Sequence, residues 1–220
     1  MIPQSGRYEL FAGGVTCGEE RWRIEPRAEL STEASGEQET RVPHPFPSVT
    51  TWRATLSPLH RVTSIEIDWR VGERHLRAVH RAEGDLWHVR IDHSVHTREQ
   101  EGDCPTFCEV LFGSHVFHSI ALQRYVWAKG AEHEFPALMI GPPWMAVEPG
   151  RQRIVCTAQI ERETVTGRSL ARRLEVHDPA NSAPPYSMWV DDEDRVLESF
   201  EGLDEGVPWM RLAAWERGSA

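Results

Sequence analysis

The chain has few cysteines and tyrosines and lacks a long apolar run. Its four cysteines, Cys17, Cys104, Cys108 and Cys156, are too few and too scattered among 220 residues for a disulfide framework. We therefore expect reduced thiols and a cytoplasmic protein. The first residues show no basic stretch followed by an apolar one, so we expect no secretory signal. No segment has the apolar length that spans a bilayer.

The chain also lacks an excess of positive charge and the common nucleotide motifs. With 34 acidic and 24 basic residues, its formal net charge of -10 repels phosphate backbones, which argues against nucleic acid as a partner. It contains neither a Walker A sequence nor G-x-G-x-x-G, so we expect no cofactor. Gly113-Ser114-His115 lacks the second glycine of a nucleophile elbow. We therefore predict no catalytic residues.

Tryptophan, by contrast, is plentiful. The chain has nine Trp against three Tyr, with hydrophobic residues at 40% and charged residues at 26%, values ordinary for a globular protein. This length fits either one large or two small domains. For an antiparallel sheet protein we expect a single β domain over residues 1–220.

Three strands between Val62 and Asp92 alternate apolar and polar residues. Two-residue turns at Gly72-Glu73 and Glu83-Gly84 predict their register. With this register, one face of the three strands is almost wholly apolar. A slip of one residue in the pairing would move the apolar side chains to the other face. We expect the following residues on that buried face: Ile65, Ile67, Trp69, Leu76, Ala78, His80, Trp87, Val89 and Ile91.

The same register predicts specific cross-strand pairs. Trp69 faces Leu76 and Ile65 faces His80 in the first hairpin. In the second hairpin, His80 faces Trp87, with Leu76 opposite Ile91 and Ala78 opposite Val89. On the solvated face, Asp68 lies across from Arg77 and His75 across from Asp92, where unlike charges attract.

Further strands follow from alternation and turn residues. A second clear hairpin has its loop at Thr166-Gly167-Arg168, which places Ile160 across from Leu174. Residues 31–38 read as an exposed loop and Pro136–Val147 as a loop that covers the interior. The remaining expected strands are Tyr8–Thr16, Arg21–Glu25, Thr51–Leu56, Arg153–Glu163, Ser169–His177, Tyr186–Val190, Arg195–Phe200 and Trp209–Trp215.

A helix interrupts the strands. Asp103-Cys104-Pro105-Thr106 resembles a helix start, and the apolar residues from Phe107 to Trp127 are too dense for simple alternation. Gly113 opposes one continuous helix, so a short helix followed by a strand is the alternative. The fold class is therefore all-β: a curved antiparallel sheet or half-open barrel with a central helical insertion.

Two groups of residues are candidates for metal or acid–base chemistry. Cys104, Cys108, His115 and His118 are zinc-ligand types, but their spacing along a helix sets the pairs apart, so we predict no metal site there. His80 lies on the apolar face, where it could be a tuned acid or base. The alternative function is accordingly a hydrolase or metal-dependent enzyme with histidines near the sheet opening, His88, His93 and His96 among them.

The tryptophans spread over most strands. If a curved sheet does not fill its own interior, such rings line a cavity for an apolar ligand. The other interpretation is a plain core. We expect a ligand-binding interior that includes the following residues, the last two near the opening: Trp69, His80, Trp87, Trp127 and Trp144.

Three segments of the middle third resemble a glycolipid-binding family related to bacterial lipoprotein carriers. They are Gly84–Trp87, Asp103–Thr106 and Ile120–Tyr125. That family has a tryptophan strand, an acidic-led loop and a strand ending in arginine, here Arg124. Its threonine-proline-phenylalanine-threonine-asparagine loop and its paired arginines are replaced by Pro105–Phe107 and this single arginine.

The resemblance implies a half-barrel of antiparallel sheet wrapped around a helix. It also implies a lipid-like ligand, with Arg124 among the binding residues. We accordingly predict non-catalytic binding of an apolar or amphipathic small molecule inside the curved sheet.

Overall fold

Fifteen strands and one short helix make up the computed structural model, which describes residues 3–27, 31–93, 96–105, 108–178, 184–204 and 206–218. The elements are β1 (Gln4–Ala12), β2 (Val15–Pro26), β3 (Thr32–Thr40), β4 (Val49–Leu56), β5 (Val62–Val71), β6 (Arg74–Glu83), β7 (Leu86–His93), β8 (Thr97–Asp103), β9 (Glu109–Phe112), α1 (His115–Leu122), β10 (Glu132–Gly141), β11 (Ala146–Thr164), β12 (Gly167–His177), β13 (Tyr186–Val190), β14 (Val196–Phe200) and β15 (Pro208–Arg217).

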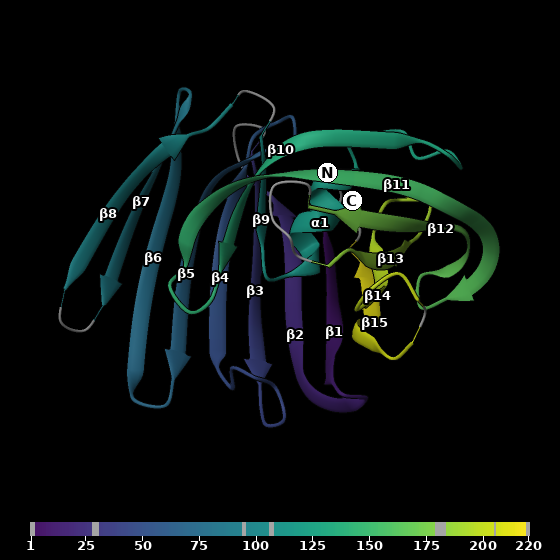
Figure 1. Ribbon diagram of the computed structural model, residues 1–220, viewed down its shortest axis with the longest axis horizontal. Helices are drawn as coiled ribbons and strands as arrows, with labels where there is room; N and C mark the ends of the chain where they lie inside the picture. The colour runs from purple at the N-terminus through teal and green to yellow at the C-terminus, as the bar shows by residue number, and fades with distance from the viewer. Residues whose placement is uncertain are drawn as a thin grey trace.

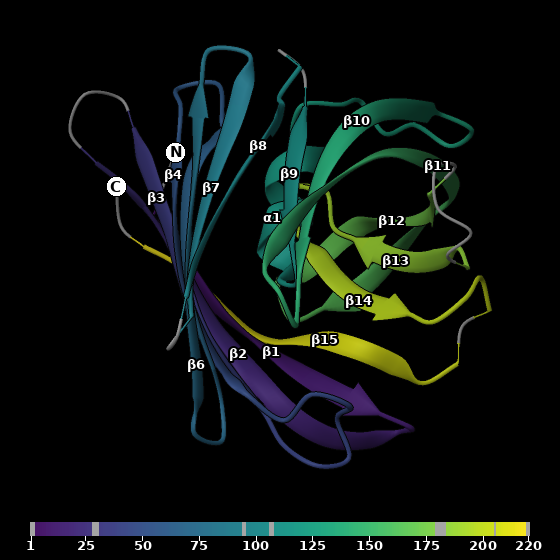
Figure 2. The same ribbon diagram turned by 60° about the vertical axis from the view of Figure 1, so that its left-hand side comes forward.

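All the strands belong to one curved sheet. Its order is β8-β7-β6-β5-β4-β3-β2-β1-β15-β14-β13-β12-β11-β10-β9. Neighbours are antiparallel except β9 and β10, which run parallel. β8 and β9 are consecutive in the chain yet lie at the two edges, so the sheet curls without closing. Figures 1 and 2 show it wrapped around α1. The predicted half-open, all-β fold with a central helix is confirmed.

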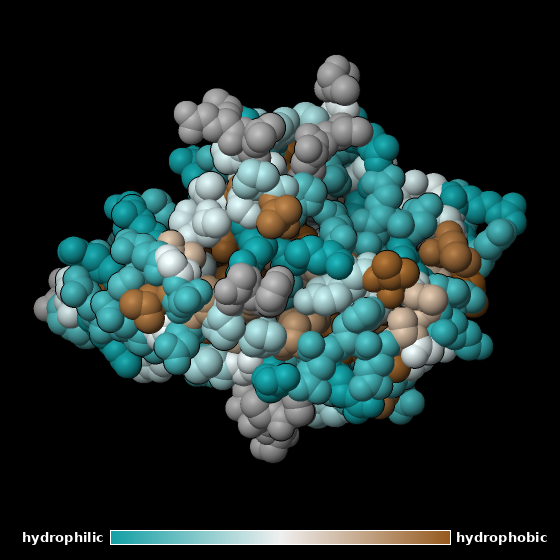
Figure 3. Space-filling model, turned by 90° about the horizontal axis from the view of Figure 1, so that it is seen from above, coloured by the Kyte–Doolittle hydropathy of each residue, from teal (hydrophilic) through white to brown (hydrophobic). Residues whose placement is uncertain are grey.

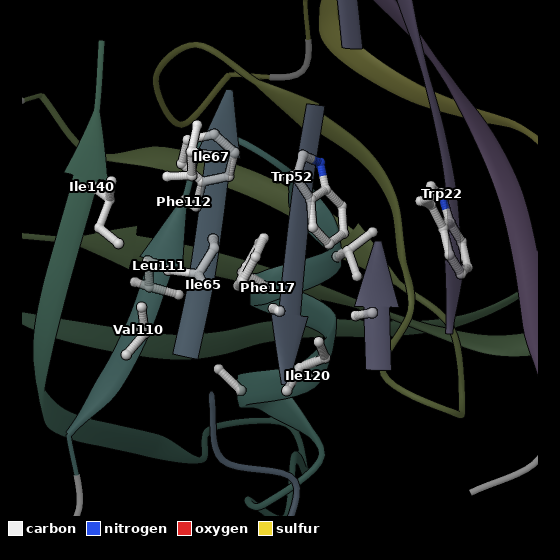
Figure 4. Packing of buried hydrophobic residues seen from close by; sticks show 14 of the residues in the cluster. Trp22, Trp52, Ile65, Ile67, Val110, Leu111, Phe112, Phe117, Ile120 and Ile140 are labelled. Atoms are coloured by element: carbon white, nitrogen blue, oxygen red, sulfur yellow. The ribbon is translucent and has the colours of Figure 1, made fainter. Parts of the chain in front are cut away.

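Helix α1 fills the concave side of the sheet. Ser114 caps its N-terminus and accepts a hydrogen bond from the Val116 N–H at 3.2 Å. Every residue of α1 except His118 is buried. The Phe117 ring, fully buried, packs 5.0 Å from the Trp52 ring, and Figure 4 shows it between the strands that carry Trp52 and Ile65. The core therefore lies between α1 and the inner face of the sheet.

The helix is much shorter than the dense run of apolar residues from Phe107 to Trp127 suggests. Residues 109–112 form strand β9, all of them buried, and only 115–122 are helical. Both predicted forms are therefore wrong, because a short strand precedes a short helix. Dense apolar sequence marks burial here, since β9 runs beside β10 at one edge of the sheet and α1 packs against the inner face of the sheet.

The central meander follows the predicted pattern. Trp69 pairs with Leu76, Ile65 with His80 and Asp68 with Arg77. The apolar face is confirmed as buried: Ile65, Ile67, Trp69, Leu76, Ala78, His80, Trp87, Val89 and Ile91 are each at most 9% exposed.

The second hairpin of the meander is shifted by two residues from the prediction. Its turn falls on Gly84 and Asp85, so that Glu83 pairs with Leu86. His80 consequently faces Val89, and Asp92 pairs with Arg77 rather than with His75. A shift of two keeps each side chain on its face, which explains why the burial prediction survived an incorrect register.

Three other segments differ from expectation. Residues 32–40 form strand β3 instead of an exposed loop. Most of the expected covering loop, residues 136–141 and 146–147, belongs to β10 and β11. The hairpin of β11 and β12 turns at Val165-Thr166, which pairs Ile160 with Ala171 rather than Leu174.

The face of the molecule seen from above is mostly polar. Figure 3, seen from above, shows hydrophilic residues with apolar ones scattered singly among them. Within the described part of the chain, no helix has both the length and the apolarity that crossing a bilayer requires.

Two strand glycines allow a direct test of the packing against Trp52. A Cβ added at Gly36 in β3 would lie 2.6 Å from the Trp52 indole, whereas one added at Gly102 in β8 would meet open space. The Trp52 indole is hydrogen-bonded to Glu20 and packed against Phe117, so it cannot move aside easily. We expect Gly36→Ala to lower the free energy of unfolding by about 1–3 kcal/mol.

Urea denaturation of both variants measures the effect. Gly102→Ala, the matched control, should leave the midpoint nearly unchanged. Equal midpoints for the two variants would contradict this packing.

Candidate functional site

A largely enclosed cavity, open to solvent where Phe46, Gly113 and Pro142 are exposed, lies inside one end of the half-barrel. Its volume is about 130 Å³. Five bulky rings, those of Phe11, Phe46, Trp69, Phe112 and Trp209, share its wall with uncharged polar side chains. The full lining is Leu10, Phe11, Gln38, Thr40, His44, Phe46, Ser48, Thr50, Trp69, Phe112, Gly113, Pro142, Met145 and Trp209. Mixed walls of this kind suit an apolar ligand that carries a polar atom.

One row of the sheet builds the main wall. Gln38 of β3 pairs with Thr50 of β4, which pairs with Trp69 of β5. Neighbours in register point to the same face, so these three side chains stand together on the concave side. Gln38 also pairs with Glu20 of β2, which lies on the same face.

Two connections border the cavity. In the loop after β3, the Thr40 hydroxyl donates to the Phe46 carbonyl at 2.8 Å, and the Phe46 N–H donates to His44 Nδ1 at 3.0 Å. In the turn between β10 and β11, Met145 is 1% exposed and has a positive φ of 51°. Its N–H donates to the Gly141 carbonyl at 2.9 Å. Local hydrogen bonds thus position both borders.

Trp144 lies on the outer side of the same turn and is 62% exposed. It borders an open hollow of about 200 Å³ together with Ile91, His93, His96 and Arg98. The His93 ring is stacked 4.7 Å from His96 and lies 6.1 Å from Trp144. The turn therefore separates an enclosed cavity from an open aromatic hollow.

A larger hollow lies elsewhere, on the outer face of β1–β6. It is a wide, open groove of about 670 Å³ between charged side chains such as Arg21, Arg53 and Glu66. Arg77 and Glu66 form an exposed ion pair there at 3.4 Å. Such solvated pairs contribute little binding energy. We therefore take the smaller, enclosed cavity as the candidate site.

Glu20 is a buried carboxyl beside the cavity wall. It is 0% exposed, and its Oε1 accepts a hydrogen bond from Trp52 Nε1 at 3.0 Å. Burial raises the pKa of Glu20 to about 7, while hydrogen bonds from the Ser114 hydroxyl and from Trp52 act in the opposite direction. Ser114, which caps the N-terminus of α1, thus lies near this carboxyl.

Two histidines of α1 bind polar partners on the far strands. His115 Nε2 is hydrogen-bonded to the Ser199 hydroxyl, and His118 Nε2 lies 2.8 Å from the Tyr186 hydroxyl. Burial lowers the pKa of His118 to about 4 and lowers that of His115 well below its usual value. Both imidazoles are therefore neutral at physiological pH.

The Ser199–His115 pair has the composition of a nucleophile and its base, but not the exposure. Ser199 is 0% and His115 2% exposed. Among the described residues neither side chain reaches the surface, whereas a nucleophile and the atom it attacks must come within contact distance. The pair serves to join α1 to β14.

The residues expected from sequence lie at separate places. Trp69 lines the enclosed cavity and Trp144 the open hollow. Trp87 and His80 are buried together, the indole Nε1 donating to His80 Nδ1 at 3.3 Å. Burial lowers the pKa of His80 to about 4, opposed by the backbone of Met145.

Trp127 and Arg124 have structural partners near the C-terminal end of α1. The Trp127 indole donates to the Leu122 carbonyl at 3.0 Å and is 3% exposed. Arg124 is paired with Glu109 and donates to the His60 carbonyl at 3.0 Å. Neither residue lines the candidate cavity.

The zinc-type residues also take separate partners. Cys104 and Cys108 lie beside Arg61, whereas His115 and His118 bond Ser199 and Tyr186. Over the described residues, no three His, Cys, Asp or Glu side chains gather closely enough to hold a metal ion.

Several cavity residues were missed by sequence reasoning. Gln38 lies in the segment taken for a loop, and Met145 in the segment taken for a cover. Alternation of Thr32, Ala34, Gly36, Gln38 and Thr40 is the signal that could have shown β3 as a strand with one inner face.

Known proteins resemble this chain in structure only. No family model and no curated protein sequence matches it. A DUF1089 family protein from Pseudomonas aeruginosa is similar in structure, with a TM-score of 0.56 and 16% identity over 89% of this chain and 97% of that one. A beta-barrel-like protein of the domain of unknown function DUF1849 from Brucella abortus has a TM-score of 0.63 and 9% identity over 100% of this chain and 99% of that one.

These similarities show the fold. Neither description names a glycolipid or a lipoprotein carrier. The half-barrel implied by the sequence resemblance is therefore confirmed as a barrel-like fold, and the lipid-like ligand stays a prediction.

The buried carboxyl of Glu20 predicts a pH-dependent stability. Its folded-state pKa of about 7 exceeds the ordinary value of 4.5, so folding favours the protonated form. The stabilisation of the folded state by protonated Glu20 is complete below pH 4.5. It is lost as the pH rises through 7, which lowers the free energy of unfolding by about 3 kcal/mol. Glu20→Gln keeps the shape and removes the titration.

Urea unfolding of wild type and Glu20→Gln between pH 4 and 8 tests this. The variant should gain stability relative to wild type as the pH rises from about 4.5 to above 7. A difference that does not change with pH would contradict a buried, titrating Glu20.

Proposed function

We propose that the protein binds, without chemical conversion, the apolar end of an amphipathic small molecule in the enclosed cavity. The observation that carries the proposal is the lining. Trp69, Phe112 and Trp209 offer apolar rings, while Gln38 and Thr50 offer uncharged hydrogen-bonding groups on one wall. Burial of apolar surface would drive binding, at about 25 cal/mol per Å² before the costs of ordering.

The volume limits what can enter. Sites for whole drug-sized ligands measure about 300–1,000 Å³, and this cavity measures about 130 Å³. It suits one end of a molecule, such as a short acyl end or a single ring. The remainder would lie at the border formed by Phe46, which is 46% exposed, and by the turn that carries Trp144.

Charge plays little part in this proposal. The lining contains no Asp, Glu, Lys or Arg side chain, and its polar groups are amide, hydroxyl and imidazole. A ligand with an uncharged polar atom near its apolar end satisfies this wall. A carboxylate or phosphate would have to stay outside, in water.

Catalysis has weaker support. The Ser199–His115 pair is buried and does not line the cavity, although the His115 ring contacts Trp209 of its wall, and His80 is neutral and hydrogen-bonded to Trp87. The stacked His93 and His96 at the open hollow are the remaining basis for the enzymatic alternative. A binding role requires only the cavity and its lining, whereas a catalytic role would also require reacting groups placed in exact positions.

Filling the cavity is the most direct test. Gly113 lines it, and an added Cβ there meets no atom within 4 Å. We expect Gly113→Leu to occupy the space and to abolish binding of a fluorescent fatty acid or lysolipid. Binding is followed by quenching or shift of tryptophan emission, since Trp69 and Trp209 contact the ligand.

Gly102→Leu, at an open position on β8 outside the cavity, is the matched control and should bind like wild type. Thermal unfolding shows that both variants are folded. Unchanged binding in Gly113→Leu, or no binding of any apolar probe to wild type at micromolar concentration, would refute the proposal.

The exposed Trp144 provides a second test. If the part of the ligand that remains outside lies against it, Trp144→Ala should weaken binding about tenfold, equivalent to about 1.4 kcal/mol. Affinity should be the same in low and high salt, because no charged lining group is involved. Strong salt dependence would instead indicate binding at the charged outer groove.

A further inference from the structure

The side chains that line the cavity differ in which hydrogen bonds they can still form. Thr40 is occupied as donor and as acceptor: its hydroxyl donates to the Phe46 carbonyl at 2.8 Å and accepts from the Ser48 N–H at 2.9 Å. The Ser48 hydroxyl lies 3.2 Å from the same oxygen. These two hydroxyls therefore hold the loop after β3 in place and leave little hydrogen-bonding capacity for a ligand.

His44, on the cavity wall, is a hydrogen-bond donor. Its Nδ1 accepts the Phe46 N–H at 3.0 Å, so this nitrogen carries no hydrogen. In a neutral imidazole the hydrogen is then on Nε2, which donates and does not accept. The ring lines the cavity and is partly exposed. One hydrogen bond within the loop thus determines that this histidine can only donate to a ligand.

Trp69 is a second donor on this wall. An indole N–H donates and does not accept. Trp69 Nε1 has no hydrogen-bond partner among the described residues, and although the side chain is only 9% exposed, this nitrogen is not wholly covered. The side chain stands on the concave side of the sheet and lines the cavity, so the cavity is the space from which this N–H can be reached. Trp209 adds another indole to the same wall.

Acceptors are scarcer on this wall than donors. Gln38 and Thr50 can each accept but also donate, and the Met145 thioether accepts only weakly. As far as the structure describes this lining, no side chain on it accepts strongly without also donating. A ligand without a polar atom would displace water from His44 and Trp69 and leave their N–H groups unpaired, which costs free energy. A ligand atom that accepts hydrogen bonds removes this cost.

We propose that the cavity selects molecules that carry a carbonyl oxygen close to their apolar end, as ketones, esters and amides do. This inference rests on the proposed binding function and names the class of its ligand. A carbonyl oxygen has two lone pairs and brings no hydrogen of its own, so it can accept from donors such as His44 Nε2 and the Trp69 indole. A hydroxyl would also have to donate its own hydrogen, for which this wall offers only Gln38 and Thr50.

Competition between two probes of the same shape tests this selection. Methyl octyl ketone and its methylene analogue, in which C=CH₂ replaces C=O, are each used to displace a bound fluorescent fatty acid. We expect wild type to bind the ketone more tightly, although the ketone is the more soluble in water. Trp69→Phe removes the indole N–H, and His44→Asn keeps an acceptor for the Phe46 N–H but removes the Nε2 donor. Each variant should lower the affinity for the ketone about tenfold more than the affinity for the analogue.

Phe112→Leu is the matched control, because it alters the same wall without removing a donor. It should weaken binding of both probes by the same factor, and thermal unfolding shows that all three variants are folded. Infrared spectroscopy of the bound, isotope-labelled ketone gives an independent readout: its C=O stretch should lie below the value in hexane and move toward that value in Trp69→Phe and His44→Asn.

The outcomes separate this inference from the proposed function. Equal losses for the ketone and its analogue in both donor variants, or a bound C=O stretch equal to that in hexane, would overturn the selection for a carbonyl and leave the binding function standing. If neither probe displaces the fatty acid from wild type, both the selection and the proposed function are refuted.

Discussion

Burial of the concave face around α1 is the interaction on which the rest of the structure depends. A sheet with two free edges gains no closure from its own hydrogen bonds, so its inner face needs another element to exclude water. Phe117 and Ile120 of α1 provide it, packed among the inner side chains of the central strands (Figure 4). The helix is only eight residues long, and its stability comes from this packing rather than from its length.

The same burial determines the chemistry of the interior. Glu20, His80 and His115 are all taken from water, and each has a hydrogen-bonded partner on a neighbouring element. Burial favours the neutral form of every one of them, through a raised pKa for the carboxyl and lowered values for the imidazoles. Around these three groups the interior is therefore polar, while burial disfavours charge on them.

Large indoles replace side chains that the strands themselves lack. The ring of Trp52 occupies the place where Gly36 would carry a Cβ, and that of Trp22 does the same above Gly6. This explains why β3 resembled a loop: its inner face is filled by a neighbouring strand's tryptophan, not by its own apolar residues. The composition of β3 alone does not reveal that Trp52 of β4 packs over it.

The sequence by itself determined the strands with regular alternation, the buried face of the meander and the presence of one helical interruption. These follow from side-chain period and turn residues, which act within a few positions of the chain. Only the tertiary structure decided the cavity and the Ser199–His115 pair. Each depends on how strands distant in sequence curl toward one another, and a shift of two residues in register already changes the partners while leaving the alternation the same.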